Sequence, residues 1–129
     1  MSTCTMYVDT EPDIAEAVRQ ALKAAVSAGF GNVQAHYIAT ATSELAANLF
    51  IHAGGGVFTL LQLHDRPGIE LMTVDNGPGI VDIGKALQDG YSTGKGLGCG
   101  LPGVQRLMDD LSIESQPGVQ TVIRAQKWL

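Results

Sequence analysis

A glycine-rich run late in the chain has the composition of a phosphate-binding loop. Glycine occupies every second position at Gly94, Gly96, Gly98 and Gly100, directly before a helix that Leu101 and Pro102 open. Each glycine costs about 1 kcal/mol of chain entropy relative to alanine, so structure alone explains the repetition poorly. Free backbone N–H groups ahead of a helix N-terminus bind anions. The run therefore predicts a site for phosphate groups.

Two common phosphate loops do not fit this run. A Walker A loop has four residues between its first glycine and Gly-Lys, followed by Ser or Thr. Here three residues separate Gly90 from Gly94-Lys95, and Gly96 follows. A dinucleotide fingerprint follows the first strand of a βαβ unit, whereas this run lies late in the chain and follows a loop.

The segment Asp75-Asn76-Gly77-Pro78-Gly79 follows a predicted strand. Asn-Gly and Pro-Gly are typical of a tight turn, which is one interpretation of the segment. A carboxylate at a strand end, followed by glycines that let the backbone approach a ligand closely, also suits recognition of a flat polar ring.

Glu44 and Asn48 lie four positions apart in a predicted helix, so both side chains point the same way beside its apolar stripe. Asparagine in mid-helix costs roughly half a kcal/mol relative to alanine. Alone, such a pair is typical of two solvated residues, and it indicates a site only together with the other motifs.

The composition limits the classes of protein to consider. The chain has 129 residues, of which 45% are apolar and 16% charged, and this predicts a single compact domain, residues 1–129. A net charge of −5 argues against a nucleic-acid partner. Two cysteines and three histidines show no metal-ligand spacing. No apolar run is long enough to cross a membrane and no signal peptide is recognisable, so we expect a cytoplasmic protein.

The apolar periodicity predicts the elements that position these motifs. We expect a strand at 5–8, a helix from a capping box at 10–13 to Gly29, and a helix at 34–52. Strands at 57–64 and 69–75, a helix opening at 98–102, and a hairpin of strands at 111–115 and 119–127 follow. This order predicts an α/β (α+β) two-layer sandwich, in which a mixed, mostly antiparallel sheet carries helices on one face.

In this order, the Glu44/Asn48 pair, the 75–79 segment and the 94–100 run resemble the N, G1 and G2 boxes of the GHKL superfamily, which implies the Bergerat ATP-binding fold. The chain from about residue 6 to 129 is similar to the bacterial serine/threonine-protein kinases that regulate sigma factors by partner switching. The segments 98–109 and 123–128 are most like the switch kinase of the stressosome, a stress-response assembly.

The resemblance implies a role for each matching residue. It makes Asn48 the ligand of Mg²⁺ and of the ATP phosphates, and Glu44 the catalytic residue that polarises the attacking hydroxyl. Asp75 accepts a hydrogen bond from the adenine amino group. Gly77 belongs to the same nucleotide-binding segment. Gly79 lets the chain pass against the base. The remaining implied nucleotide contacts are the backbone of Gly94, Gly96, Gly98, Gly100 and Leu101 around the phosphates, and Thr121 near the adenine.

The resemblance also implies partners. The expected substrate is a serine or threonine of a STAS-domain antagonist or scaffold protein, with a downstream phosphatase or regulator and no nucleic acid or membrane. Two alternatives stay open: an anti-sigma factor that binds a sigma factor directly, and a non-catalytic module that uses ATP to set its shape. For Thr121, an ordinary strand residue is an equally good interpretation.

Overall fold

The computed structural model describes residues 3–79 and 100–129, which form a two-layer α/β fold. The first half contains β1 (Thr3–Val8), α1 (Glu11–Ala28), α2 (Asn32–His52), β2 (Gly56–Leu63) and β3 (Gly68–Asp75). The second contains α4 (Leu101–Leu107), β4 (Asp110–Gln116) and β5 (Gln120–Trp128). The predicted elements in the described ranges are present, although Val119, expected in the last strand, lies in the turn before β5.

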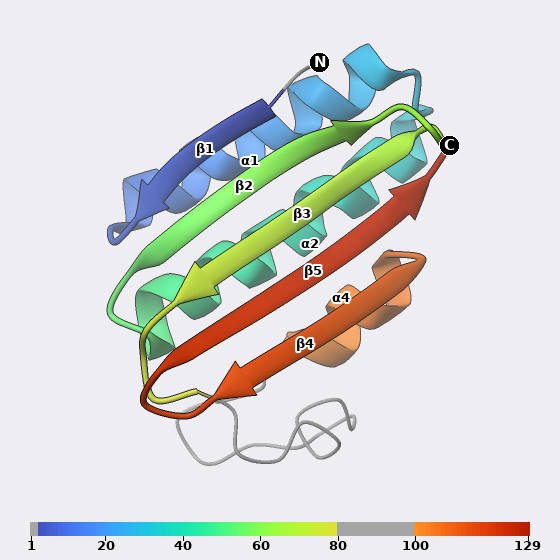
Figure 1. Ribbon diagram of the computed structural model, residues 1–129. Helices are drawn as coiled ribbons and strands as arrows, with labels where there is room; N and C mark the ends of the chain where they lie inside the picture. Colours follow the sequence, from blue (N-terminus) through green and yellow to red (C-terminus); the bar gives the residue numbers. More distant parts are fainter. Residues whose placement is uncertain (1–2, 80–99) are drawn as a thin grey trace.

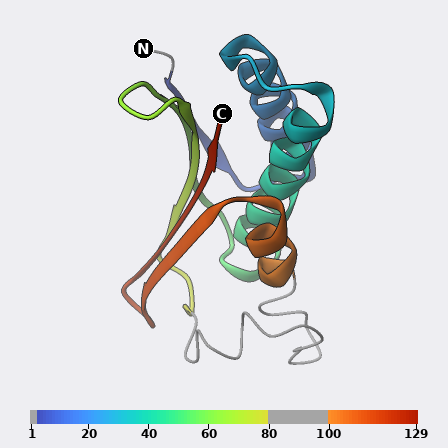
Figure 2. The same cartoon turned by 90° about the vertical axis from the view of Figure 1, so that its right-hand side faces the viewer.

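The strands form a five-stranded sheet in the order β1-β2-β3-β5-β4, and each neighbouring pair is antiparallel. The helices cover one face of this sheet and leave the other open, as Figures 1 and 2 show. The prediction of a largely antiparallel sheet with helices on one face is therefore confirmed. Among the described helices, none is long and apolar enough to cross a bilayer.

The core lies between the sheet and α2, the central helix of the layer. Alternate strand residues such as Ile69 and Leu71 point into it, because successive side chains of a strand point to opposite faces. On the helix side, Ile38, Leu45 and Leu49 meet them, all at most 1% exposed. Burial of these side chains supplies most of the stabilisation of such a domain.

Helix α1 begins and ends at the signals that its sequence contains. Thr10 Oγ1 accepts a hydrogen bond from the Asp13 N–H (3.3 Å), and the Asp13 carboxylate accepts from the N–H groups of Asp9 (3.1 Å) and Thr10 (3.2 Å). The Asp9 N–H is the largest cause of a lowered pKa for Asp13. At the other end, Gly29 adopts φ 102°, which favours glycine.

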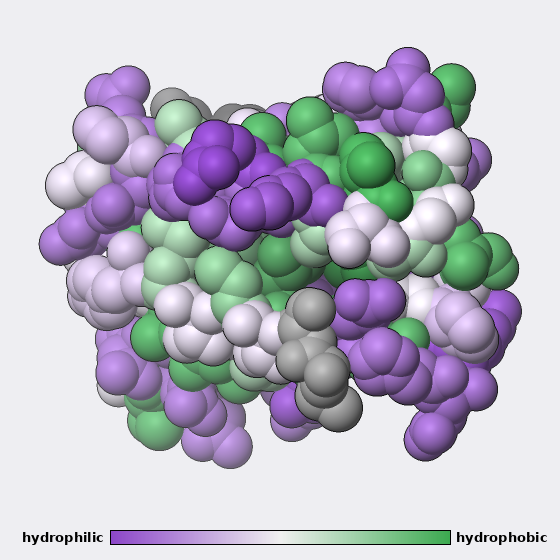
Figure 3. All heavy atoms as spheres, turned by 90° about the horizontal axis from the view of Figure 1, so that it is seen from above, coloured by the Kyte–Doolittle hydropathy of each residue, from purple (hydrophilic) through white to green (hydrophobic). Residues whose placement is uncertain are grey.

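The end of the sheet near both termini is closed by polar contacts. Lys127 is 6% exposed, and its ammonium donates to the carbonyl oxygen of Leu107, the last residue of α4, at 2.7 Å. The indole N–H of Trp128 donates to Asp110 at 2.7 Å, and Arg66 stacks on the same ring. Seen from above, this end shows hydrophobic side chains interspersed with hydrophilic ones (Figure 3). These contacts attach the C-terminal end of α4 to β5.

Candidate functional site

A row of small and polar residues crosses the opposite end of the sheet, at the lower end in Figure 1. Asp75, at the end of β3, is paired with Thr121 of β5, and Thr121 is paired with Ser115 of β4. On the β2 side, a Cβ added to Gly56 would lie 3.1 Å from the Asp75 Cβ. All three polar side chains belong to the helix-covered face of the sheet, where the alternation of buried residues places them.

Asp75 is half-buried, and one of its oxygens is already engaged. Its Oδ1 accepts a hydrogen bond from the N–H of Gly77 at 2.8 Å, which closes a tight turn immediately after β3. A carboxylate has about four acceptor positions, so Oδ2 can still accept from a ligand amino group. The turn interpretation and the ligand interpretation of this segment are thus compatible.

Ser115 belongs to this row, although no sequence motif predicted it. Its hydroxyl oxygen lies 2.8 Å from that of Thr121, which is 3% exposed. The signal that could have identified it is the hairpin register, because Ser115 and Thr121 are cross-strand partners on either side of the turn at 117–119.

The glycines after β3 make close backbone contacts. A Cβ on Gly77 would lie 2.8 Å from the Cα of Ala53, just beyond α2. Gly79 has φ 82°, and a Cβ there would lie 2.8 Å from the Pro117 Cα and 2.9 Å from the Ser115 hydroxyl oxygen. These positions therefore need glycine to pack against α2 and the β4–β5 hairpin. The close approach of Gly79 to a base stays a prediction.

Glu44 and Asn48 are half-buried on α2, and Glu44 meets the start of α4. Gly100 is the N-cap residue of α4, with φ 86°, and the Glu44 carboxylate fills the place that a Cβ on Gly100 would take. No hydrogen bond joins Glu44 or Asn48 to another residue among the described parts of the chain. Glu44 and the last glycine of the run are thus in contact, and the polar groups of Glu44 and Asn48 are available to a ligand.

Leu101, one residue further, is 1% exposed, so its side chain belongs to the core, and a phosphate contact could come only from its backbone. Gly94, Gly96 and Gly98 lie outside the described residues. Within the described ranges, no three His, Cys, Asp or Glu side chains gather in a way that could hold a metal ion.

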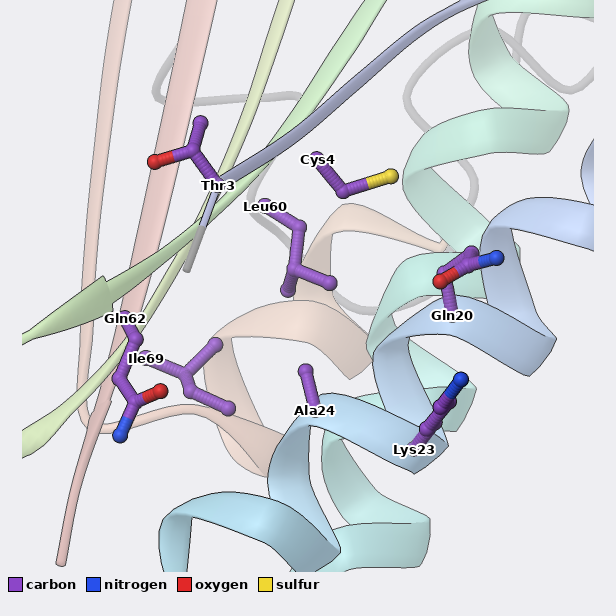
Figure 4. Close-up of a pocket in the computed structure, with 8 residues that line it drawn as sticks. All are labelled: Thr3, Cys4, Gln20, Lys23, Ala24, Leu60, Gln62 and Ile69. Carbon is purple, nitrogen blue, oxygen red and sulfur yellow. The ribbon is translucent and has the colours of Figure 1, made fainter. Parts of the chain in front are cut away.

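Two pockets lie at opposite ends of the sheet. One of about 250 Å³ is lined by residues that include Asp75 and Asn76, Gly54 to Gly56, Tyr7 and Gln120. The larger, about 290 Å³, lies between β1, β2 and α1 and includes Cys4, Gln20 and Lys23 (Figure 4). This larger pocket contains none of the predicted site residues. We place the candidate site at the Asp75 end because the segment after β3 lies there and Glu44 of α2 contacts Gly100 at the start of α4.

Comparison with known proteins identifies the family of the chain. Residues 8–127 match the family described as the histidine kinase-like ATPase domain. The serine/threonine-protein kinase RsbT of Bacillus subtilis is 48% identical over 122 residues, covering 93% of this chain and 92% of the relative. The anti-sigma F factor of the same species is 36% identical over 101 residues, covering 71% and 68%.

Among solved structures, the SiaB–SiaC complex of Pseudomonas aeruginosa contains a chain that matches with a TM-score of 0.70 over 95% of this chain and 88% of that one. The sequence identity is 12%, so this likeness supports the fold alone. The family match covers nearly the whole chain, and the relatives above are similar over most of their own length. The chain belongs to the histidine kinase-like ATPase domain family, in its group of partner-switching serine/threonine-protein kinases.

Proposed function

We propose that this kinase binds Mg²⁺-ATP between α2, the end of β3 and the start of α4, and transfers the γ-phosphate to a serine or threonine of a STAS-domain protein. The observation that carries the proposal is the contact between Glu44 and Gly100. It brings the candidate catalytic carboxylate to the start of the helix that follows the glycine run. A transferred phosphoryl group held at Gly100 and the start of α4 would therefore lie near Glu44.

The described residues fit a nucleotide. Asp75 keeps an acceptor oxygen for the adenine amino group, and Asn48 lies one turn beyond Glu44 on α2. A Mg²⁺ ion bound by Asn48 would take its other ligands from phosphate oxygens and water, as Mg²⁺ commonly does. Backbone N–H groups of the glycine run would complete the binding of the phosphates, which reconciles an acidic chain with an anionic ligand.

The chemistry asked of the protein is modest. Phosphoryl transfer depends mainly on positioning the reactants in line and on neutralising charge, and it needs no covalent enzyme intermediate. Glu44 would accept a hydrogen bond from the attacking hydroxyl and orient it toward the γ-phosphate. We propose that this takes place in the cytoplasm, with a phosphatase or a further regulator downstream of the phosphorylated partner.

A second candidate function is direct binding of a sigma factor, and the 36% identity to an anti-sigma F factor favours it. The relative with higher identity and greater coverage is the kinase RsbT, so we place phosphorylation of a STAS protein first. A non-catalytic switch would not need a carboxylate at the start of α4, where Glu44 lies beside Gly100.

The test is a transfer assay with γ-labelled ATP and Mg²⁺, using the STAS-domain proteins and sigma factors of the same genome as separate partners. We expect label on one or more STAS proteins and none with the Asn48→Ala variant. Stable capture of a sigma factor with no labelled STAS protein would instead favour the anti-sigma function. If ADP binds but no partner is ever labelled, the kinase proposal is wrong.

A further inference from the structure

We propose that Ile51, near the end of α2, is a specificity-determining residue that binds the protein substrate beside the acceptor hydroxyl. This inference rests on the proposed function, since it assumes that Glu44 orients that hydroxyl toward the γ-phosphate. The Ile51 side chain is 62% exposed, although isoleucine is usually buried. Single exposed apolar residues are common, so the inference depends on the position of Ile51 relative to Glu44 and Asn48.

The three residues lie on one face of α2. Asn48 follows Glu44 by four positions and Ile51 follows Asn48 by three, which is the spacing of neighbouring side chains on one side of a helix. Leu45 and Leu49 point to the other side and are buried in the core. At a rise of about 1.5 Å per residue, Ile51 lies about 10 Å from Glu44 along the helix axis.

A protein substrate has to cover this stretch of α2. Its hydroxyl must reach Glu44, and a specific interface commonly buries about 800 Å² on each partner, which corresponds to a disc of about 16 Å radius. Ile51 lies within that distance of Glu44. Ala47, on the same side of the helix between them, is small and half-buried, so it leaves room for a close approach. Ile51 would then lie near the middle of the interface, where a few well-packed side chains supply most of the binding free energy.

The chemistry of the proposed contact is apolar. The Ile51 side chain has no polar atom, so a matching substrate presents an apolar side chain about 10 Å from its acceptor serine or threonine. Water, the alternative acceptor of a phosphoryl group, cannot make this contact. Ile51 should therefore favour transfer to a protein without taking part in nucleotide binding.

The experiment measures transfer from γ-labelled ATP to the STAS-domain protein that the partner assay identifies, at saturating Mg²⁺-ATP. Ile51→Ser removes the apolar contact, and serine and isoleucine have similar helix propensities. The KM for the STAS protein should rise about five- to twentyfold, the scale of burying the exposed part of one aliphatic side chain. The kcat and the ADP affinity should stay within twofold. Ile51→Val keeps most of the apolar surface and should keep the KM near that of wild type.

The matched control is Val26→Ser, at a residue 61% exposed in the last turn of α1. Gly29, which caps that helix, lies beside Leu129, so Val26 lies at the end of the fold away from Glu44, and its KM should equal that of wild type. The inference is overturned if Ile51→Ser keeps the wild-type KM, if Val26→Ser raises the KM equally, or if Ile51→Ser acts by lowering ADP affinity. A wild type that labels no STAS protein contradicts the proposed function itself, so the two failures are distinguishable.

Discussion

The two ends of the sheet satisfy their polar groups in different ways. At the end near the termini, Lys127 donates to the Leu107 carbonyl, and Trp128 donates to Asp110. At the other end, Glu44 and Asn48 are half-buried and, within the described residues, have no hydrogen-bond partner. Gly68 at the first end packs against the backbone of β5, whereas Gly100 at the second packs against the Glu44 side chain.

The difference separates stability from function. A half-buried polar group without a partner contributes little to folding and can even cost free energy. At Glu44 and Asn48, a ligand can complete the hydrogen bonds. Substitutions at the site end should change binding or transfer more than stability, and those at the far end should do the opposite.

The largest effect is expected for Glu44→Gln, which keeps size and hydrogen bonding but removes the basic oxygen. Transfer to a STAS protein should fall by ~10²–10⁴, the usual contribution of general acid–base catalysis, while ATP affinity stays within a few-fold. Single-turnover transfer at saturating ATP, with a separate binding constant, measures both quantities. Transfer at the wild-type rate would exclude the proposed role of Glu44.

Gly100→Ala tests the contact itself. The new Cβ would overlap the Glu44 carboxylate and displace it, and a misplacement of about 1 Å costs roughly 10²-fold in rate. We expect transfer to fall far more than ADP affinity. Alanine at φ 86° also strains the backbone, so the matched control is Gly118→Ala, with φ 79° and open space for a Cβ; its transfer rate should equal that of wild type.

Only part of the arrangement that these two variants test could be predicted from the sequence. The elements were predictable, because apolar periodicity and local signals such as Thr10 and Gly29 define their limits. The motifs identified Glu44 and Asp75 as candidates. The contact of Glu44 with Gly100 was not predictable, since it depends on how α2 packs against α4, which lie far apart in the chain. The place of Ser115 depends on cross-strand register, which the turn only partly specifies.

Asp75→Asn should act on nucleotide binding. The Gly77 N–H bond can remain, because the amide oxygen still accepts. An NH₂ group, however, replaces the oxygen that we propose accepts from the adenine amino group. We expect ADP binding to weaken by about 1–3 kcal/mol and GDP to weaken less, measured by calorimetry. Asp65→Asn, an exposed turn residue at the far end, is the control and should bind both nucleotides as wild type does.

Lys127→Met tests the far end. The change leaves the part-buried Leu107 carbonyl without its donor, so the free energy of unfolding should fall by about 1–3 kcal/mol. ADP affinity of the folded protein should stay within twofold. Denaturant unfolding and calorimetry measure the two quantities. A large loss of ADP affinity would show that the two ends are coupled through α4.

The smallest effect concerns the capping box of α1, a structural feature at the site end. Thr10→Ala removes the oxygen that accepts from the Asp13 N–H and should lower the free energy of unfolding by about 1 kcal/mol.

In wild type the pKa of Asp13 lies below its ordinary value of 3.8, first because the Asp9 N–H donates to it and then because of Thr10. A lowered folded-state pKa means that the stabilisation is present above pH 3.8 and is lost as the pH falls through the lowered value. In Thr10→Ala the Asp13 pKa should move back toward 3.8, as an NMR titration of its carboxyl carbon would show, while ADP affinity at neutral pH stays unchanged. An unchanged Asp13 titration would mean that Thr10 has no part in holding the carboxylate, and a changed ADP affinity would make the cap part of the site.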